Sequence, residues 1–121
     1  MAKILLVLDE PIVAIDLTTT LAMAGHEVVG IASNTTQAVS FATERRPEIV
    51  IVDVVLAEGT DGIAAARALK ARVPLPVIFI SASSDPRTRA AANLIEPVGF
   101  LRKPLTRLDV LRAVEKVAVS G

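Results

Sequence analysis

The chain of 121 residues has no cysteine, no tryptophan and no tyrosine, and it has a single histidine. The absence of cysteine excludes disulfides, thiolate metal sites and thiol nucleophiles. A single histidine argues against a zinc site and against a histidine-centred catalytic triad. Any chemistry that this chain performs must therefore use carboxylates, hydroxyls and lysine.

The sequence also lacks an excess of either charge and a long hydrophobic run. Thirteen lysines and arginines balance thirteen acids, so we expect no direct nucleic-acid partner and no anionic membrane partner bound through bulk charge. Hydrophobic residues make up 52% of the chain, but polar residues interrupt each run before the roughly 18 residues of a membrane span. The run from Ile4 to Leu8 is too short for a signal peptide. We therefore expect a cytoplasmic protein whose apolar residues form a core.

Short apolar runs alternate with amphipathic stretches, which predicts repeated strand and helix units around a parallel sheet. The predicted strands are Lys3 to Leu8, Glu27 to Ala32, Ile49 to Asp53, Val77 to Ile80 and Val98 to Leu101. The predicted helices are Pro11 to Ala24 before a capping Gly25, Asn34 to Arg46, Asp61 to Arg72, one that begins at Asp85-Pro86, and Pro104 to Val119. The strands are apolar at successive positions, so the sheet should be buried on both faces. We expect one domain over residues 1–121 and no output domain.

Polar side chains follow these runs where the carboxyl ends of parallel strands meet, at one edge of the sheet. Asp9 and Glu10 follow the first run, Asp53 ends the third, Ser81 follows the fourth, and Lys103 follows the fifth. Carboxylates hold a hard cation such as Mg²⁺, while a hydroxyl and an ammonium suit phosphoryl oxygens, so this set favours phosphoryl transfer. Asp9 and Glu10 are also ordinary residues at the start of a helix. Asp53 is harder to explain structurally, because an unpaired buried charge is costly.

In this order of residues the chain resembles the receiver domain of two-component response regulators. The resemblance runs from Lys3-Ile4-Leu5 through Asp53 and Ser81-Ala82 to the stretch from Gly99 to Pro104. It implies a doubly wound, flavodoxin-like (βα)5 fold whose five-stranded parallel sheet has the order 2-1-3-4-5. It also implies that the chain is a switch rather than an enzyme. The switch would receive a phosphoryl group from a histidine kinase or phosphotransfer protein and then change its binding to a downstream partner.

The resemblance assigns roles to individual residues at the phosphoryl site. Asp53 is implied as the phosphoacceptor, with Lys103 contacting the phosphoryl group. Mg²⁺ would be held by Asp9, Asp53 and the backbone carbonyl of Val55. Glu10 is a further candidate ligand, acting through water.

A second set of roles concerns the switch. Ser81 would turn toward the phosphoryl group, and Phe100 would move inward to fill the space. This movement would couple the site to a partner-binding surface on the fourth helix, fifth strand and fifth helix. The resemblance further implies that the peptide bond between Lys103 and Pro104 is cis, which proline permits.

Three features depart from the family pattern. Leu8 stands where the first of two consecutive acids belongs, unless a one-residue slip pairs Asp9 with Glu10 as the two acids. The loop after the third strand is one residue longer than is common and has Ala57 in place of a proline. Phe100 replaces a frequent tyrosine and so lacks its hydroxyl.

Leu8 also favours an alternative function, a phosphorylation-independent pseudo-receiver that binds its partners constitutively. Retention of Asp53, Ser81 and Lys103 argues against that alternative. A flavin-binding domain of similar topology is disfavoured because tryptophan and tyrosine are absent. A phosphatase with a nucleophilic aspartate on the first strand would need an acid where the chain has Pro11.

The remaining polar residues receive structural interpretations. His26 is assigned a structural or surface role, and Gly62 a flexible place in a loop. Five arginines form either a basic rim on the partner-binding surface or a solvated helix surface: Arg87, Arg89, Arg102, Arg107 and Arg112.

Overall fold

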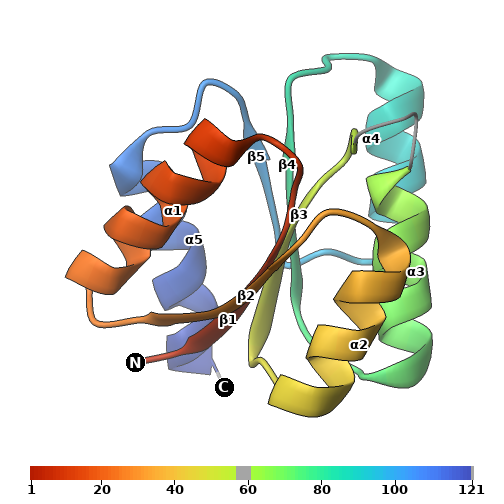
Figure 1. The fold of residues 1–121 in the computed structure, drawn as a ribbon. Helices are drawn as coiled ribbons and strands as arrows, with labels where there is room; N and C mark the ends of the chain where they lie inside the picture. The colour runs from red at the N-terminus through yellow and green to blue at the C-terminus, as the bar shows by residue number, and fades with distance from the viewer. Residues whose placement is uncertain (57–60, 121) are drawn as a thin grey trace.

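The structure is a computed structural model and describes residues 1–56 and 61–120. Strands and helices alternate along the chain (Figure 1). The strands are β1 (Lys3–Val7), β2 (Glu27–Ala32), β3 (Ile49–Asp53), β4 (Val77–Ser81) and β5 (Gly99–Arg102). The helices are α1 (Pro11–Met23), α2 (Thr35–Arg45), α3 (Gly62–Arg72), α4 (Pro86–Asn93) and α5 (Arg107–Ser120). In the described part of the chain, no helix has the length and apolar character needed to cross a membrane.

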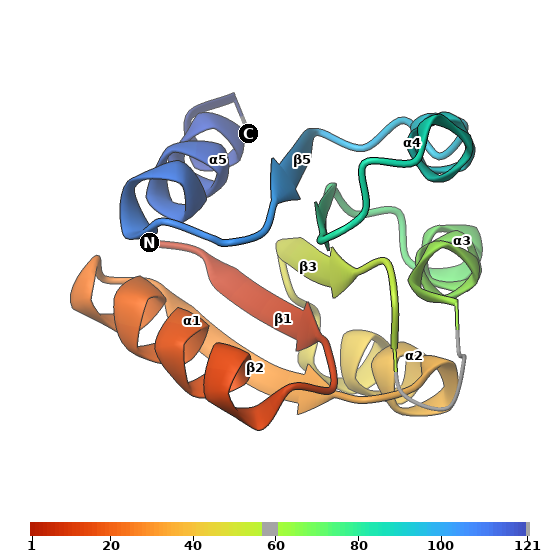
Figure 2. The ribbon, with the colours of Figure 1, turned by 90° about the horizontal axis from the view of Figure 1, so that it is seen from above.

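The strands form one five-stranded parallel sheet in the order β2-β1-β3-β4-β5. Helices α1 and α5 cover one face of the sheet, and α2, α3 and α4 cover the other (Figure 2). This arrangement confirms the doubly wound, flavodoxin-like fold. It also brings the carboxyl ends of β1, β3 and β4 together at the middle of one edge of the sheet, where ligands bind in open α/β folds.

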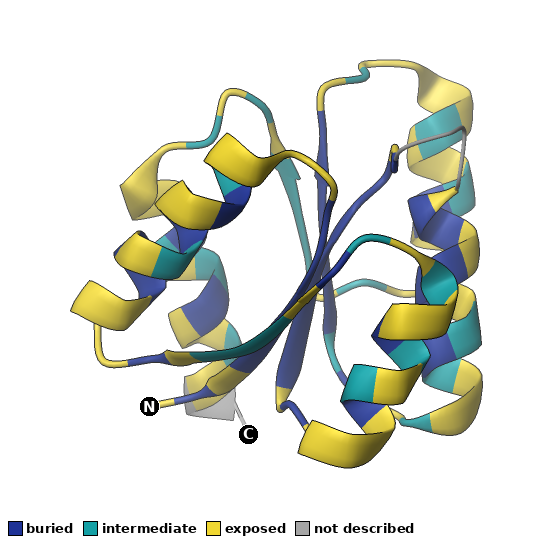
Figure 3. Cartoon of the chain, viewed as in Figure 1, coloured by how far each residue is buried: buried dark blue, intermediate teal, exposed yellow. Residues whose placement is uncertain are grey.

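Two apolar clusters fill the spaces between the sheet and its helix layers. Successive residues of a strand point to opposite faces, so β3 supplies both clusters. Ile49 and Ile51 pack toward α1 and α5, whereas Val50 and Val52 pack toward α2, α3 and α4. The central strands appear almost entirely as buried ribbon between exposed outer helix faces (Figure 3).

The prediction that the sheet is buried on both faces is confirmed for the three central strands and is wrong for the two at the edges. Strand β2 is mostly half-buried and exposes Ile31, and β5 has no fully buried residue. Each edge strand has a neighbouring strand on one side only. Its side chains are therefore less completely covered than those of β1, β3 and β4.

Capping side chains set several of the helix boundaries. Asn34, Asp61 and Asp85 each accept a hydrogen bond from a backbone N–H in the first turn of the helix that follows. The prediction that the last helix begins at Pro104 is wrong, since α5 begins at Arg107. The Thr106 hydroxyl accepts a hydrogen bond from the Asp109 N–H at 3.1 Å and caps this helix instead.

His26 has the structural role that the sequence indicated. Its side chain is buried, and Nδ1 accepts a hydrogen bond of 3.0 Å from the backbone N–H of Ala2. The backbone N–H of the following residue, Glu27, donates to the Ala2 carbonyl at 2.9 Å. These bonds fasten the N-terminal residues to the start of β2, at the end of the sheet away from the polar cluster.

Candidate functional site

Three strands bring the polar residues of the candidate site together. Asp53 is the last residue of β3, Ser81 is the last residue of β4, and Lys103 directly follows β5. The backbone N–H of Lys103 donates to the Ser81 carbonyl at 2.9 Å, which joins the ends of β4 and β5. The sheet thus places these residues along one edge, as the sequence predicted.

Lys103 connects two carboxylates at the centre of the site. Its Nζ donates to Asp53 Oδ2 at 2.6 Å and to Glu10 Oε1 at 2.5 Å. Asp53 Oδ1 accepts a hydrogen bond of 3.0 Å from the backbone N–H of Val55. The Asp53 side chain is only 3% exposed, so these contacts replace the water that burial removes. The result is a carboxylate held in place by an ammonium on one oxygen and a backbone amide on the other.

The pKa of Lys103 reflects opposing influences. Burial, which is the largest single influence, lowers the pKa of its ammonium. The hydrogen bonds and negative charges of Asp53 and Glu10 together outweigh burial and raise the pKa above the ordinary value of 10.5. Lys103 is therefore a positively charged group throughout the neutral range, as contact with phosphoryl oxygens requires.

A pH titration tests this arrangement. Because the pKa of Lys103 is raised in the folded chain, its ion pairs stabilise the fold fully below pH 10.5, and this contribution is lost as the pH rises through the folded-state pKa. We expect the side-chain NMR signals of Lys103 to titrate above pH 10.5 in the unmodified chain and at a lower pH in Asp53→Asn. Titration of Lys103 at the same pH in both proteins would contradict the assigned role of Asp53.

Glu10 acts here as a partner of Lys103 and does not cap a helix through its side chain. It occupies the N-cap position of α1, but its carboxylate makes no capping hydrogen bond. The interpretation of Glu10 as only a helix-start residue therefore does not account for its contact with Lys103. Asp9, the neighbouring acid, is exposed at the same edge.

Ser81 is buried, and in this structure its hydroxyl serves the loop that follows β4. Its Oγ accepts a hydrogen bond of 3.0 Å from the backbone N–H of Ser83. No hydrogen bond joins Ser81 to Asp53 in the structure as described for residues 1–56 and 61–120. The hydroxyl is thus engaged away from the candidate phosphoacceptor.

Phe100 lies half-buried between β4 and α4. Its ring packs at a tilt against Phe79, with 6.2 Å between the ring centroids. The guanidinium of Arg89 lies over the Phe100 ring, 4.2 Å from the centroid. The peptide bond between Lys103 and Pro104 is cis, as the resemblance implied.

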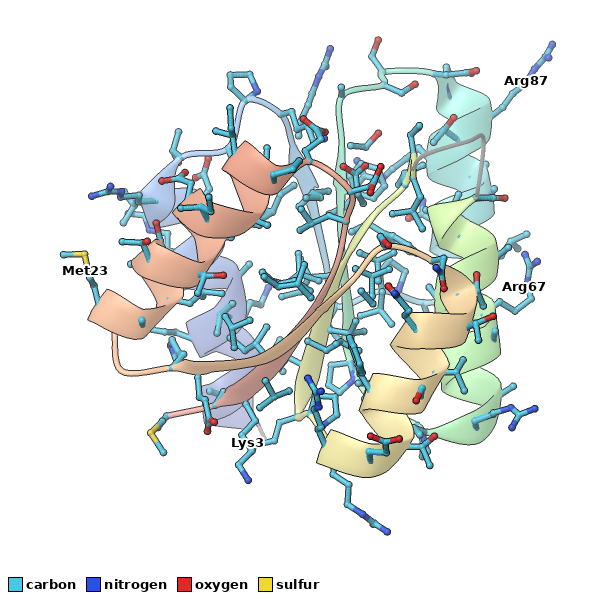
Figure 4. The ribbon with its side chains drawn as sticks, viewed as in Figure 1. Lys3, Met23, Arg67 and Arg87 are labelled. Atoms are coloured by element: carbon cyan, nitrogen blue, oxygen red, sulfur yellow. The ribbon has the colours of Figure 1, made fainter. Side chains whose placement is uncertain are left out.

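The five arginines do not form one uniform basic rim. Arg87 points away from the sheet, as Arg67 does on the neighbouring helix (Figure 4). Arg107 lies 3.9 Å from Asp16 of α1. Arg89 is also exposed, but its guanidinium stacks on the Phe100 ring.

The strand register places Leu8 beside the candidate phosphoacceptor. Val7 pairs with Val52, and Leu8 and Asp53 each follow this pair by one residue. Leu8 is buried in the cluster that also holds Ile49 and Ile51, so its side chain lies on the face of the sheet to which Asp53 belongs by alternation. An apolar side chain therefore occupies the position next to Asp53 on the neighbouring strand.

The remaining donors fit a cation that takes few protein ligands. No group of three or more acidic or histidine side chains in residues 1–56 and 61–120 is clustered well enough to hold a metal ion. Mg²⁺ usually binds through one or two carboxylates, with water and phosphate oxygens completing its shell. Asp9, Asp53 and the Val55 carbonyl supply oxygen donors of that kind at one edge of the sheet. The residues present thus fit Mg²⁺ bound by few protein ligands, with water and phosphate oxygens supplying the others.

Gly62 is the residue whose importance the sequence interpretation missed. It is not a loop residue but the buried first residue of α3, and its N–H donates to the Val54 carbonyl at 2.8 Å. A Cβ atom at this position would lie 1.8 Å from the Asp53 carbonyl oxygen. The sequence signal was a glycine directly after a capping aspartate, where no turn requires glycine. The predicted one-residue insertion in the loop before Gly62, and the Ala57 that replaces a proline there, concern residues 57–60, which lie outside the described residues.

The fold and the site together define a flavodoxin-like α/β domain in which a buried aspartate pairs with a partly exposed lysine, at the edge of the sheet where the strands end. The chain belongs to the response regulator receiver domain family, which matches residues 4–115. Receiver domains of this family typically bind Mg²⁺ at their phosphorylation site and catalyse nothing beyond their own dephosphorylation.

Individual relatives agree with this family. The chain is 34% identical over 94% of its length to the phyllosphere-induced regulator PhyR of Methylorubrum extorquens, and 31% identical over 98% of its length to the transcriptional regulatory protein PdtaR of Mycobacterium tuberculosis. It spans only 42% and 57% of those two proteins. Among solved structures, the signal receiver domain of a modulated diguanylate cyclase from Desulfovibrio desulfuricans matches with a TM-score of 0.89 and 33% identity, covering 100% of this chain and 99% of that one.

Proposed function

We propose that this chain is a cytoplasmic phosphoacceptor domain that takes a phosphoryl group from a histidine kinase or phosphotransfer protein onto Asp53. The observation that carries this proposal is the Asp53 carboxylate, which is buried at the ligand-binding edge and held by Lys103 and the Val55 N–H. A buried carboxylate fixed in this way is ready to act as a nucleophile. The acyl phosphate then changes how the domain binds a downstream partner.

The proposed transfer needs few groups. An Asp53 oxygen attacks the phosphorus of a phosphohistidine, the P–O bond forms as the P–N bond breaks, and the histidine nitrogen leaves with the bonding electrons. The Lys103 ammonium, already at 2.6 Å from Asp53, moves to a phosphoryl oxygen and offsets its charge. Glu10 keeps the second contact to Lys103 and so holds the ammonium at the site while Asp53 reacts. Later attack of water on the phosphorus releases phosphate and restores Asp53.

Mg²⁺ would supply further positive charge to the phosphoryl oxygens. Asp9, Asp53 and the Val55 carbonyl would hold it, with Glu10 contributing through water. Leu8 contributes no oxygen, so we expect weaker Mg²⁺ binding than an acid at that position would give.

The surface of α1 next to the site supports docking of the phosphodonor there. Ile12 is 83% exposed and Ile15 is 66% exposed. Large apolar side chains that cluster in contact with water usually mark an interface. A hollow lies on each side of them, one reaching Ile31 and the other reaching Leu105. These two hollows also include Glu10 and Lys103 respectively, so a protein bound on α1 would cover the site.

Intact-mass analysis after incubation with acetyl phosphate tests the proposed function. We expect a Mg²⁺-dependent gain of one phosphoryl group in the unmodified chain and none in Asp53→Asn. Asn keeps the size of the side chain but is not a carboxylate nucleophile, so it is the matched control. A phosphoryl group that remains in Asp53→Asn would contradict the assignment of the acceptor.

Leu8 supports the second candidate function, a pseudo-receiver that binds partners without phosphorylation, because it leaves the neighbouring strand without an acid next to Asp53. The same mass experiment separates the two functions. Absence of an adduct at saturating Mg²⁺, together with absence of beryllofluoride binding, would favour the pseudo-receiver. An adduct on Asp53 would exclude it.

Replacing Leu8 by aspartate tests the reduced magnesium site. We expect Leu8→Asp to tighten Mg²⁺ binding by about 10- to 100-fold, the range seen when a supporting group around a metal site is changed. Leu8→Asn is the control, since it has the same shape as aspartate without the charge. Mg²⁺ affinity is measured by calorimetric titration. Equal affinities in Leu8→Asp and Leu8→Asn would show that position 8 does not face the cation.

A further inference from the structure

Helix α4 is attached to the rest of the domain by few contacts. Ala92 is its one buried residue in the described structure, and the Asp85 cap binds only the helix's own first turn. Beyond its C-terminal end, Lys70 Nζ of α3 donates to the Ile95 carbonyl at 2.6 Å. Contacts between the middle of α4 and β5 therefore weigh heavily in fixing where this helix lies.

One such contact is the stack of Arg89 on Phe100. The guanidinium carbon lies 4.2 Å from the centre of the ring, within the range of a cation–π interaction. The same ring also packs at a tilt against the fully buried Phe79. Phe100 thus contacts both a buried core side chain and a charged side chain of a helix with few buried residues.

This stack is connected to the site through β4. Phe79 pairs with Phe100 across the β4–β5 register, and Ser81 lies two residues beyond Phe79 on the same strand. Residues two apart on a strand lie on the same face of the sheet, so Ser81, Phe79 and Phe100 face α4 together. In the same structure the Ser81 hydroxyl is bound to the Ser83 N–H and not to the site. The stack therefore occurs together with a Ser81 hydroxyl that is engaged away from Asp53.

We propose that Arg89 is a positioning residue that holds Phe100 against Phe79 in the unphosphorylated chain and so opposes the switch. This inference rests on the proposed function, because it concerns how phosphorylation of Asp53 changes the surface at α4. We expect inward movement of the Phe100 ring to break the stack, because the exposed Arg89 contacts the ring in its half-buried position. Removing the stack therefore shifts the equilibrium toward the phosphorylated form, and by linkage that form's ligand binds more tightly.

Beryllofluoride, which binds aspartate as a phosphoryl mimic, provides the test in the presence of Mg²⁺. We expect Arg89→Met, which keeps the long side chain but removes the charge, to bind beryllofluoride about two- to five-fold more tightly, as the loss of one exposed cation–π contact predicts. Arg89→Lys keeps a cation that stacks less well on an aromatic ring. Its beryllofluoride affinity should therefore lie between those of Arg89→Met and the unmodified chain.

The chain offers a matched control on α2. The Arg45 guanidinium lies 4.1 Å from the centre of the Phe41 ring, nearly the same distance as in the stack of Arg89 on Phe100. Both residues belong to α2, which covers the same face of the sheet as α4 but at the β2 edge (Figure 2). Arg45→Met should leave beryllofluoride affinity unchanged, even though it also removes the hydrogen bond to the Val29 carbonyl. Thermal unfolding of each variant separates a loss of stability from a shift of the switch.

A second readout observes the ring itself. The chain has three phenylalanines and no tyrosine or tryptophan, so the aromatic NMR signals of Phe100 are readily resolved. We expect them in Arg89→Met to move toward their positions in the beryllofluoride complex before any beryllofluoride is added. Unchanged or weaker beryllofluoride binding in Arg89→Met, with normal binding by the unmodified chain, would overturn the inference about Arg89 alone. No beryllofluoride binding by the unmodified chain would overturn the proposed function, and this inference with it.

Discussion

Replacing Gly62 by alanine is expected to destabilise the chain by about 1–3 kcal/mol, the usual cost of forcing an extra carbon into a packed interior. The added Cβ would lie 1.8 Å from the Asp53 carbonyl oxygen and 2.9 Å from the Val54 Cα. Both are backbone atoms, so no side-chain rotation relieves the overlap. The end of β3 or the start of α3 must move, and either movement displaces Asp53.

Gly99→Ala is the matched control for this prediction. A Cβ at Gly99 would meet Ile78 at 3.5 Å, which is ordinary van der Waals contact. We expect urea denaturation to show a much smaller loss of unfolding free energy for Gly99→Ala than for Gly62→Ala. We further expect Gly62→Ala to slow phosphorylation by acetyl phosphate and Gly99→Ala to leave it unchanged. Equal stability of the two variants would contradict the close approach of Gly62 to Asp53.

Replacing Lys103 by methionine is expected to have the second large effect, a loss of about 1–3 kcal/mol of stability, because a buried carboxylate is left without its cation. Asp53 is only 3% exposed, whereas Lys103 is 19% exposed. The cost should therefore stay below the roughly 3–5 kcal/mol lost when a fully buried pair is broken. Lys103→Met should also abolish phosphorylation by acetyl phosphate or slow it severely.

A double-mutant cycle measures the coupling behind this prediction. The neutral side chain in Asp53→Asn needs no cation, so Lys103→Met should cost much less stability when it is introduced into Asp53→Asn than into the unmodified chain. Urea denaturation at pH 7 of the four proteins supplies the cycle. Equal costs of Lys103→Met in both backgrounds would show that the ion pair of Lys103 and Asp53 contributes nothing to the fold.

The fold could be predicted because local and long-range signals agree. Each strand appears as a short apolar run, and Asn34, Asp61 and Asp85 mark helix starts in the sequence as they do in the structure. The sequence predicts too early a start for α5, because proline commonly opens a helix. A hydroxyl two residues after Pro104 caps the helix instead, and sequence alone did not rank these two signals.

The sequence predicts that the candidate residues meet at one edge of the sheet, but it does not predict their contacts. The order of strands explains why Asp53, Ser81 and Lys103 come together, since parallel strands end at the same edge. The bond from Lys103 to Glu10 depends on the path of the loop after β1, which no periodicity describes. The stack of Arg89 on Phe100 depends in the same way on where α4 lies over the sheet.

We expect a change in chemistry at Asp53 to reach Ser81 and Phe100. The most direct test is backbone and aromatic NMR of the unmodified chain with Mg²⁺ alone and then with beryllofluoride. We expect the Ser83 amide signal to shift as this amide loses its bond to the Ser81 hydroxyl, and the Phe100 ring signals to shift with it. Beryllofluoride binding that perturbs only the immediate neighbours of Asp53, and leaves the Ser83 and Phe100 signals unchanged, would contradict a switch that runs from Asp53 through Ser81 to Phe100.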